Sequence, residues 1–139
     1  MKKIKTDAIG KAGPQPVVKA KKVLSAAEEE KIAYLFESDF IGTNRELGKV
    51  LSNGFLNAIL ELPKRKSAVV LISSGVKLAI KKSYVLDKLN GLEKKGFKIL
   101  ICGTCLDYFK IREKVAVGNI SNALEIMECL TNADKVIKF

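Results

Sequence analysis

The sequence KILICGTCLDYFKIRE, residues 98–113, decides how this chain folds and where its chemistry lies. It opens with an apolar, β-branched run, Ile99–Ile101, which predicts a buried strand. Cys102 and Cys105 follow in Cys-x-x-Cys spacing, and a short segment of helical character begins directly after them. Open α/β sheets bind their ligands at the carboxyl edge of parallel strands. This stretch therefore predicts a strand that delivers two thiols to that edge.

Apolar runs of strand length alternate with helical segments on both sides of this stretch. Strands are expected at Lys31–Phe36, Ala68–Ile72, Ile99–Cys102, Val115–Val117 and Lys135–Phe139. Helices are expected at Glu46–Leu62, at Tyr84–Lys95 and from Ser121 or Asn122 to Leu130. Residues 76–80 fit either a short extended piece or the start of a helix. The alternation predicts an α/β fold, a three-layer sandwich around a mostly parallel sheet of about five strands.

The expected helix Glu46–Leu62 has an apolar face that we expect to pack on the sheet. The large and small apolar residues of this face are Leu47, Val50, Leu51, Phe55, Ala58, Ile59 and Leu62. Gly54 lies on the same face, where its lack of a side chain would let the helix approach the sheet closely.

Composition narrows the classes of function. The 139-residue chain has a formal net charge of +10, but only Arg45, Arg65 and Arg112 among its 25 basic residues are arginine. Proteins that read nucleic acids favour the bidentate arginine fork, so scattered lysines argue against nucleic acid as a partner. No apolar run approaches the roughly 20 residues that cross a bilayer, and no apolar segment follows the initial Met-Lys-Lys. An odd number of cysteines, three, predicts a reduced, cytoplasmic setting without a disulfide framework.

The two thiols of the Cys-x-x-Cys pair are the best candidate nucleophiles, because the chain contains no histidine. Cys105 lies at the expected helix start, where free N–H groups would lower its pKa. Cys102 is placed to resolve a persulfide or disulfide on Cys105, although the order of attack stays open. One pair provides two of the four ligands of structural zinc, so neither a metal nor a cofactor is expected. Cys129 falls among apolar helix residues and is expected to be part of the core.

Other loops at the same edge should bring polar groups around the pair. The candidate binding residues are Asp39, Asn44, Arg45, Glu46, Ser74, Gly75, Gly103, Thr104, Asp107 and Asn119. Arg45 either binds an oxyanion, such as a sulfur oxoacid, or pairs with the neighbouring Glu46. Asp107 and Tyr108 either donate protons or cap the short helix.

Several motifs, in order along the chain, resemble one known family. They are Ser38–Gly48, Ser74–Ala79, Cys102–Tyr108 and Ala116–Asn122. Over residues 30–139 they resemble the DsrE/DsrF-like domain, and more closely the C-terminal domain of YedF-type, sulfurtransferase-like proteins of selenium metabolism. The resemblance implies a cytoplasmic homo-oligomer that exchanges sulfur with donor and acceptor proteins.

Residues 1–30 read as an appendage to the α/β domain of residues 31–139. A strand-like start, Lys3–Lys5, leads to an expected helix over Val17–Glu30. Asp7, Gly10, Pro14 and Pro16 match the opening of a TusA/SirA-like module. Gly13 stands where that family has its persulfide-carrying cysteine, and the rest of the module is missing. The resemblance therefore implies a truncated remnant that acts as a docking helix.

Two hypotheses of different classes follow from these patterns. In the first, Cys105 and Cys102 transfer or carry sulfur, or selenium, as a persulfide or through a disulfide. In the second, the protein is a non-catalytic, oligomeric partner-binding subunit of a sulfur-relay system and its thiols are incidental. The sequence leaves open whether the protein is an enzyme.

Overall fold

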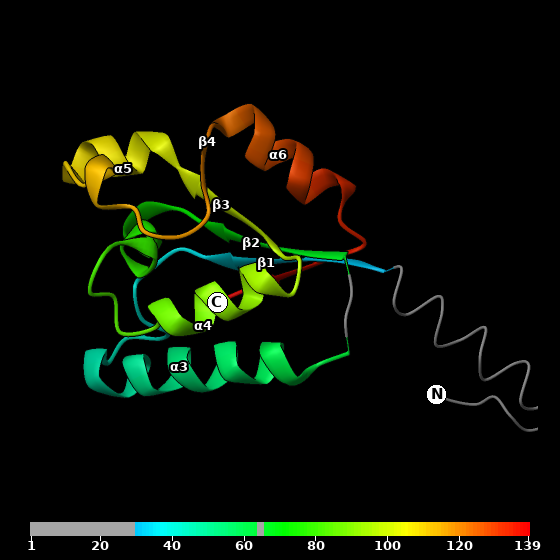
Figure 1. The fold of residues 1–139 in the computed structure, drawn as a ribbon, viewed down its shortest axis with the longest axis horizontal. Helices are drawn as coiled ribbons and strands as arrows, with labels where there is room; N and C mark the ends of the chain where they lie inside the picture. The colour runs from blue at the N-terminus through cyan, green and yellow to red at the C-terminus, as the bar shows by residue number, and fades with distance from the viewer. Residues whose placement is uncertain (1–29, 64–65) are drawn as a thin grey trace, which may run out of the picture.

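The computed structural model describes residues 30–63 and 66–139 (Figure 1). The expected strand Lys3–Lys5, the TusA-like motif around Gly13 and nearly all of the expected helix Val17–Glu30 lie outside the described residues.

A five-stranded sheet in the order β4-β3-β2-β1-β5 forms the middle of the molecule. Its strands are β1 Lys31–Phe36, β2 Lys66–Leu71, β3 Lys98–Cys102, β4 Asn119–Ser121 and β5 Lys135–Lys138. All neighbouring pairs are parallel. Parallel strands need crossover connections, which the alternating helices provide. The α/β fold with a parallel sheet is confirmed.

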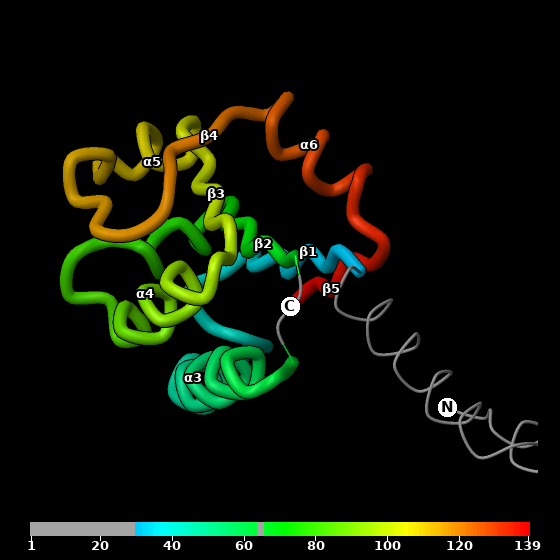
Figure 2. The backbone as a smooth tube through the Cα atoms, turned by 45° about the vertical axis from the view of Figure 1, so that its right-hand side comes forward, coloured from blue at the N-terminus to red at the C-terminus, as the bar shows by residue number. Residues whose placement is uncertain are grey.

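Helices lie on both sides of this sheet. They are α3 Arg45–Glu61, α4 Leu86–Lys94, α5 Gly103–Phe109 and α6 Ala123–Asn132, with short 3₁₀ segments η1 Ser73–Ala79 and η2 Arg112–Lys114. Figures 1 and 2 show α3 and α4 side by side on one side of the sheet, and α5 and α6 on the other. The open question at residues 76–80 has a divided answer: residues 76–79 are helical as part of η1, and Ile80 is extended.

The core is divided unequally by the sheet. On the α3 and α4 side, alternate strand residues such as Phe36, Leu71 and Ile101 join one large buried cluster. The C-terminal Phe139 closes this cluster by stacking on Phe36, with the ring centroids 4.5 Å apart. On the α6 side the buried cluster consists of Val70, Leu100 and Ile126.

The fourth strand is not where the sequence predicted it. The apolar run Val115–Val117 lies outside the sheet, and Val115 instead forms an isolated antiparallel bridge with Ile80. Gly118, with φ of +80°, then turns the chain into β4, which consists of Asn119–Ser121. The apolar run is explained by packing beside η1, because Val117 belongs to the large core cluster.

The buried face of α3 also differs from the prediction. Its buried residues are Gly48, Ser52, Leu56 and Ile59. Five of the residues expected to be buried are instead exposed: Leu47 (56%), Val50 (67%), Phe55 (47%), Leu62 (43%) and Ala58.

Gly48, not Gly54, is the glycine of close approach in α3. A Cβ on Gly48 would lie 2.5 Å from the carbonyl oxygen of Ile41, whereas nothing lies within 4 Å of one on Gly54. The loop before α3 folds back on this helix. The stripe of buried residues that begins at Gly48 therefore faces the rest of the protein.

Candidate functional site

The two thiols lie together at the carboxyl edge of the sheet, as predicted. Cys102 is the last residue of β3, and Cys105 lies in the first turn of α5. Both are free cysteines, half-buried, and their side chains are in hydrogen-bonding contact. The Cys-x-x-Cys spacing produces this contact because the chain passes directly from strand to helix between them.

A backbone group from another loop points at this pair. The N–H of Ser73, the residue that begins η1, donates a hydrogen bond to Sγ of Cys105 over 3.1 Å. Ser73 has φ of +54°, the left-handed region that non-glycine residues seldom adopt. The candidate binding residues from the sequence include the neighbouring Ser74 and Gly75 but not Ser73, although all three were expected in the loop after the second strand. No side-chain pattern could have identified it, because the donor is a main-chain group.

Gly75 and Gly103 allow the loops around the thiols to pack closely. A Cβ on Gly75 would collide with the carbonyl oxygen of Phe36 at the end of β1. A Cβ on Gly103 would lie 2.9 Å from Nη2 of Arg112 and 3.1 Å from the carbonyl oxygen of Ser121. Both predicted residues therefore belong to the framework of the site.

Asp107 on α5 forms an ion pair with Arg112, with two hydrogen bonds between the side chains. Nε and Nη2 of Arg112 donate to the two carboxylate oxygens over 2.8 and 3.0 Å, and Nη2 also lies 3.4 Å from the carbonyl oxygen of Gly103. Arg112 lowers the pKa of Asp107, so this carboxyl is ionised at neutral pH and is not a proton donor there. Tyr108 is 78% exposed, and Thr104 is exposed beside Cys105.

The candidate residues after β1 form a separate structural group. Asn44 caps α3 by accepting a hydrogen bond from the N–H of Leu47 over 2.9 Å. Arg45 donates to the Asp39 carboxylate over 3.1 Å, so its partner is Asp39 and not Glu46, which is exposed in the first turn of α3. Within residues 30–63 and 66–139, no hydrogen bond or ion pair joins this group to the thiols.

The sequence predicted Asn119 just after the fourth strand, at the carboxyl edge. This position is wrong because the fourth strand itself begins at Asn119. Asn119 lies opposite Leu100, two residues before the carboxyl edge. Ser121 is the β4 residue that lies beside Cys102 in register. It is buried, and its hydroxyl donates to the Glu125 carboxylate on α6.

The pKa of Cys105 is raised, so the expected lowering is wrong. Burial has the largest effect, the hydrogen bond with Cys102 adds to it, and the Ser73 N–H acts in the opposite direction. The short helix α5, Gly103–Phe109, does not overcome burial and the neighbouring thiol. Cys105 is therefore a protonated thiol at neutral pH.

Cys129 lies apart from the pair, on α6. It is half-buried against the small cluster on that side, which agrees only in part with the expected core position. Burial raises its pKa, and the charge of Lys98 opposes that effect. Across the described ranges no group of three or more His, Cys, Asp or Glu side chains is arranged to hold a metal ion, and no helix is long and apolar enough to span a membrane.

Together, the fold and the site define a class of protein: a parallel α/β domain that presents a thiol pair at the carboxyl edge of its sheet. The chain belongs to the DsrE/DsrF-like family, whose model matches residues 25–139. That family is associated with sulfur relay in general. No curated protein matches the chain.

Solved structures with the same fold come from bacteria and an archaeon. The ychN protein from E. coli is 16% identical with a TM-score of 0.58, over 80% of this chain and 99% of that one. MTH1491 from Methanobacterium thermoautotrophicum, a protein of unknown function, is 16% identical with a TM-score of 0.61, over 80% and 100%. BT1422 from Bacteroides thetaiotaomicron, also of unknown function, is 18% identical with a TM-score of 0.60, over 84% and 98%. At these identities the likeness concerns the fold.

Proposed function

We propose that this protein carries or transfers sulfur, or selenium, through Cys105 and Cys102. One observation supports this function above the others: the two thiols contact each other while the N–H of Ser73 is directed at Sγ of Cys105. A main-chain donor stabilises negative charge on sulfur, which is the charge that a thiolate or persulfide bears.

The chemistry is thiol–disulfide exchange with a persulfide. The Cys105 thiolate attacks the outer sulfur of a donor persulfide, so an S–S bond forms on Cys105 while the donor's S–S bond breaks and the donor leaves as a thiolate. An acceptor thiolate then removes that sulfur in the same way and restores Cys105. In the second route, the Cys102 thiolate attacks Sγ of Cys105 and expels hydrosulfide. A dithiol reductant then reduces the resulting disulfide.

The raised pKa of Cys105 sets the conditions for this reaction. The resting group is a thiol, and it must lose its proton before it attacks. A thiolate of higher pKa is intrinsically more nucleophilic, which compensates in part for its smaller population. The reaction is therefore expected to accelerate as the pH rises toward the pKa of Cys105.

The finer family placement is part of this proposal. The motifs Ser38–Gly48 and Ala116–Asn122 support a YedF-type protein of cytoplasmic sulfur or selenium metabolism that works with donor and acceptor proteins. In the N-terminal segment, Gly13 replaces the TusA-type cysteine, so we assign the relay chemistry to the Cys102–Cys105 pair alone.

The alternative function is a non-catalytic, oligomeric subunit that binds a partner of the relay. The apolar stripe of α3, formed by the exposed Leu47, Val50 and Phe55 and the half-buried Leu51, favours association. Exposed apolar patches of this kind mark interaction sites. We propose that this α3 stripe is a contact between copies of the chain, with either function.

Mass spectrometry after incubation with polysulfide separates the two functions. Wild type and the control Cys129→Ser should gain the mass of one sulfur atom or, by the second route, release hydrosulfide and form the Cys102–Cys105 disulfide, whereas Cys105→Ser should do neither. Cys102→Ser should load but fail to release hydrosulfide, because it lacks the resolving thiol. Unchanged loading in Cys105→Ser would leave the non-catalytic function.

A further inference from the structure

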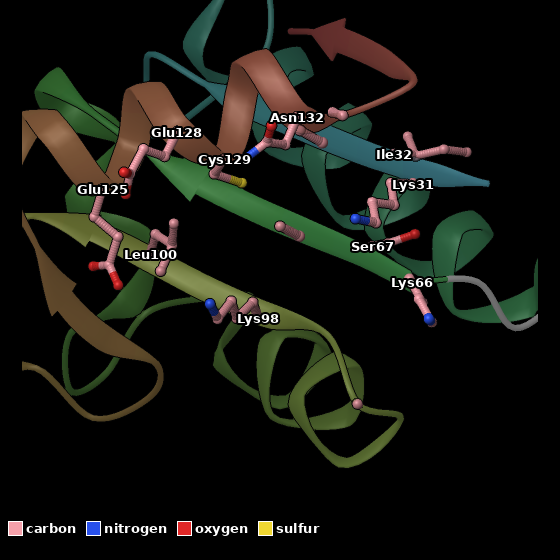
Figure 3. A pocket seen from close by; sticks show the side chains of 14 residues that line it. Lys31, Ile32, Lys66, Ser67, Lys98, Leu100, Glu125, Glu128, Cys129 and Asn132 are labelled. Carbon is pink, nitrogen blue, oxygen red and sulfur yellow. The ribbon is translucent and has the colours of Figure 1, made fainter. Parts of the chain in front are cut away.

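A hollow of about 670 Å³ lies on the α6 side of the sheet, at the amino ends of the strands (Figure 3). The thiol pair lies at the opposite, carboxyl ends. Small side chains, Ala33 and Ala68, form its floor together with Leu100. They leave space beneath α6 that larger residues would fill. A volume of this size falls within the roughly 300–1,000 Å³ of small-molecule sites.

Lysines from adjacent strands border the hollow. Lys31 on β1 and Lys66 on β2 are register partners, and Lys98 on β3 pairs with Ala68. Side chains alternate along a strand, so all three lysines share the face of the alanine floor. Figure 3 shows them along the hollow, on the strands opposite α6.

Each of these lysines is the exposed first residue of its strand. None of the three forms an ion pair with a carboxylate among residues 30–63 and 66–139. Like charges on neighbouring strands repel each other. Lysine often protects the edge strands of a sheet, but β1, β2 and β3 are the inner strands. Like charges that lie together without ion-pair partners are a departure from local rules of the kind found at functional sites.

The opposite wall, on α6, limits the charge of a ligand. It presents Glu128, Cys129 and Asn132, and the carboxylate of Glu125 already accepts the hydroxyl of Ser121. Acidic side chains facing the lysines disfavour a polyanion such as nucleic acid. They permit one anionic group held by the lysines, with Asn132 available as a hydrogen-bond partner.

We propose that this hollow binds a small organic anion, in which a carboxylate, sulfonate or phosphate group is attached to a short apolar body. Lys31, Lys66 and Lys98 hold the anionic group, and the apolar body rests on Ala33, Ala68 and Leu100. This site is separate from the thiol pair and does not depend on sulfur transfer.

Fluorescence titration of the full chain with anilinonaphthalene sulfonate, an apolar sulfonate, tests the site. Lys31→Gln/Lys66→Gln/Lys98→Gln should weaken binding at least about tenfold, because the charge-assisted hydrogen bonds are lost. The control Lys49→Gln/Lys88→Gln/Lys94→Gln removes the same charge from α3 and α4 and should change the Kd less than about twofold. Equal weakening in both variants would overturn the proposal, since it would indicate unspecific attraction.

Competition separates the anionic group from the apolar body. Hexanoate should displace the probe at least about tenfold better than hexanol or acetate, each of which lacks one of the two features. Equal displacement by hexanol would overturn the role of the lysines, and equal displacement by acetate would overturn the role of the floor.

Cys129 reports occupancy of the hollow directly. In Cys102→Ser/Cys105→Ser, Cys129 is the remaining cysteine, and hexanoate should slow its alkylation by iodoacetamide several-fold. The same addition should have no effect once the three border lysines are replaced by glutamine. An unchanged rate in the protein that retains these lysines would show that the anion binds elsewhere.

Discussion

The two faces of the sheet differ in how fully the chain covers them. On the α3 and α4 side, residues of these two helices and of the strands β1, β2 and β3 meet in one buried cluster that includes Phe36, Leu71 and Ile101. On the α6 side, Val70, Leu100 and Ile126 form the small buried cluster, and a hollow remains beside it. Burial of apolar surface is the main favourable term in folding, so the first face carries most of the stability. The second face is left open for binding.

Matched isoleucine truncations test this comparison most strongly. Ile101→Ala, on the α3 and α4 side, should destabilise the protein near the upper end of the roughly 2–5 kcal/mol range for such truncations. Ile126→Ala, on the buried side of α6, should fall near the lower end, because its surroundings can relax into the neighbouring open space. Urea denaturation measures both values, and equal losses would contradict the unequal division of the core.

Glycine substitutions compare the thiol edge with an open helix surface. Gly75→Ala should destabilise by about 2 kcal/mol or more and reduce persulfide loading, because a Cβ collides with the Phe36 carbonyl and displaces the Ser73 loop. Gly54→Ala, in the middle of α3 with nothing within 4 Å, should stabilise by up to about 1 kcal/mol. Thermal unfolding provides the measurement. A neutral Gly75→Ala would mean that the loops near Cys105 tolerate separation.

Charge substitutions on two exposed apolar helix faces test the proposed self-association. Leu47→Glu/Val50→Glu should weaken the oligomer at least about tenfold, or about 1.4 kcal/mol, in light scattering. Leu124→Glu/Met127→Glu, on exposed positions of α6, should leave the mass unchanged. A wild-type protein that is monomeric at micromolar concentration would remove the proposed role of the α3 stripe.

The pH dependence of alkylation compares the thiols of the two sides. The raised pKa of Cys105 delays thiolate formation, so its labelling should have a midpoint above that of an ordinary cysteine. Cys102→Ser removes a thiol that raises this pKa and should accelerate labelling near neutral pH. Lys98→Gln should slow labelling of Cys129, because the lysine opposes the effect of burial. Labelling that Cys102→Ser leaves unchanged would contradict the coupling.

The same pKa direction sets the sign of the effect on stability. Cys105 has a higher pKa folded than unfolded, so folding favours its protonated form. Its contribution is fully present below the unfolded pKa and is lost as the pH rises through the folded pKa. Alkaline urea titrations should therefore show a small loss of stability that Cys105→Ser lacks.

The sequence predicted most of the strands and helices and part of the candidate site. The strand before Cys102 and the start of α6 at Asn122 were predictable, because apolar runs and capping patterns act over a few residues. The position of β4 and the buried stripe of α3 were not predictable in this way. Val117 is apolar because it packs in the core outside the sheet, and Leu47 is apolar on an exposed helix face. An apolar residue indicates burial or association, but not the surface that it meets.

The parallel α/β fold and the position of the Cys102–Cys105 pair at the end of β3 were determined by the sequence alone, because both depend on local patterns. The tertiary structure alone decided that the Ser73 N–H reaches Cys105 across 32 residues of chain, and that the pKa of Cys105 rises. It also decided that Lys31, Lys66 and Lys98 meet at one hollow. These features depend on which distant segments become neighbours when apolar surfaces pack and parallel strands come into register. A short window of sequence contains no record of such neighbours.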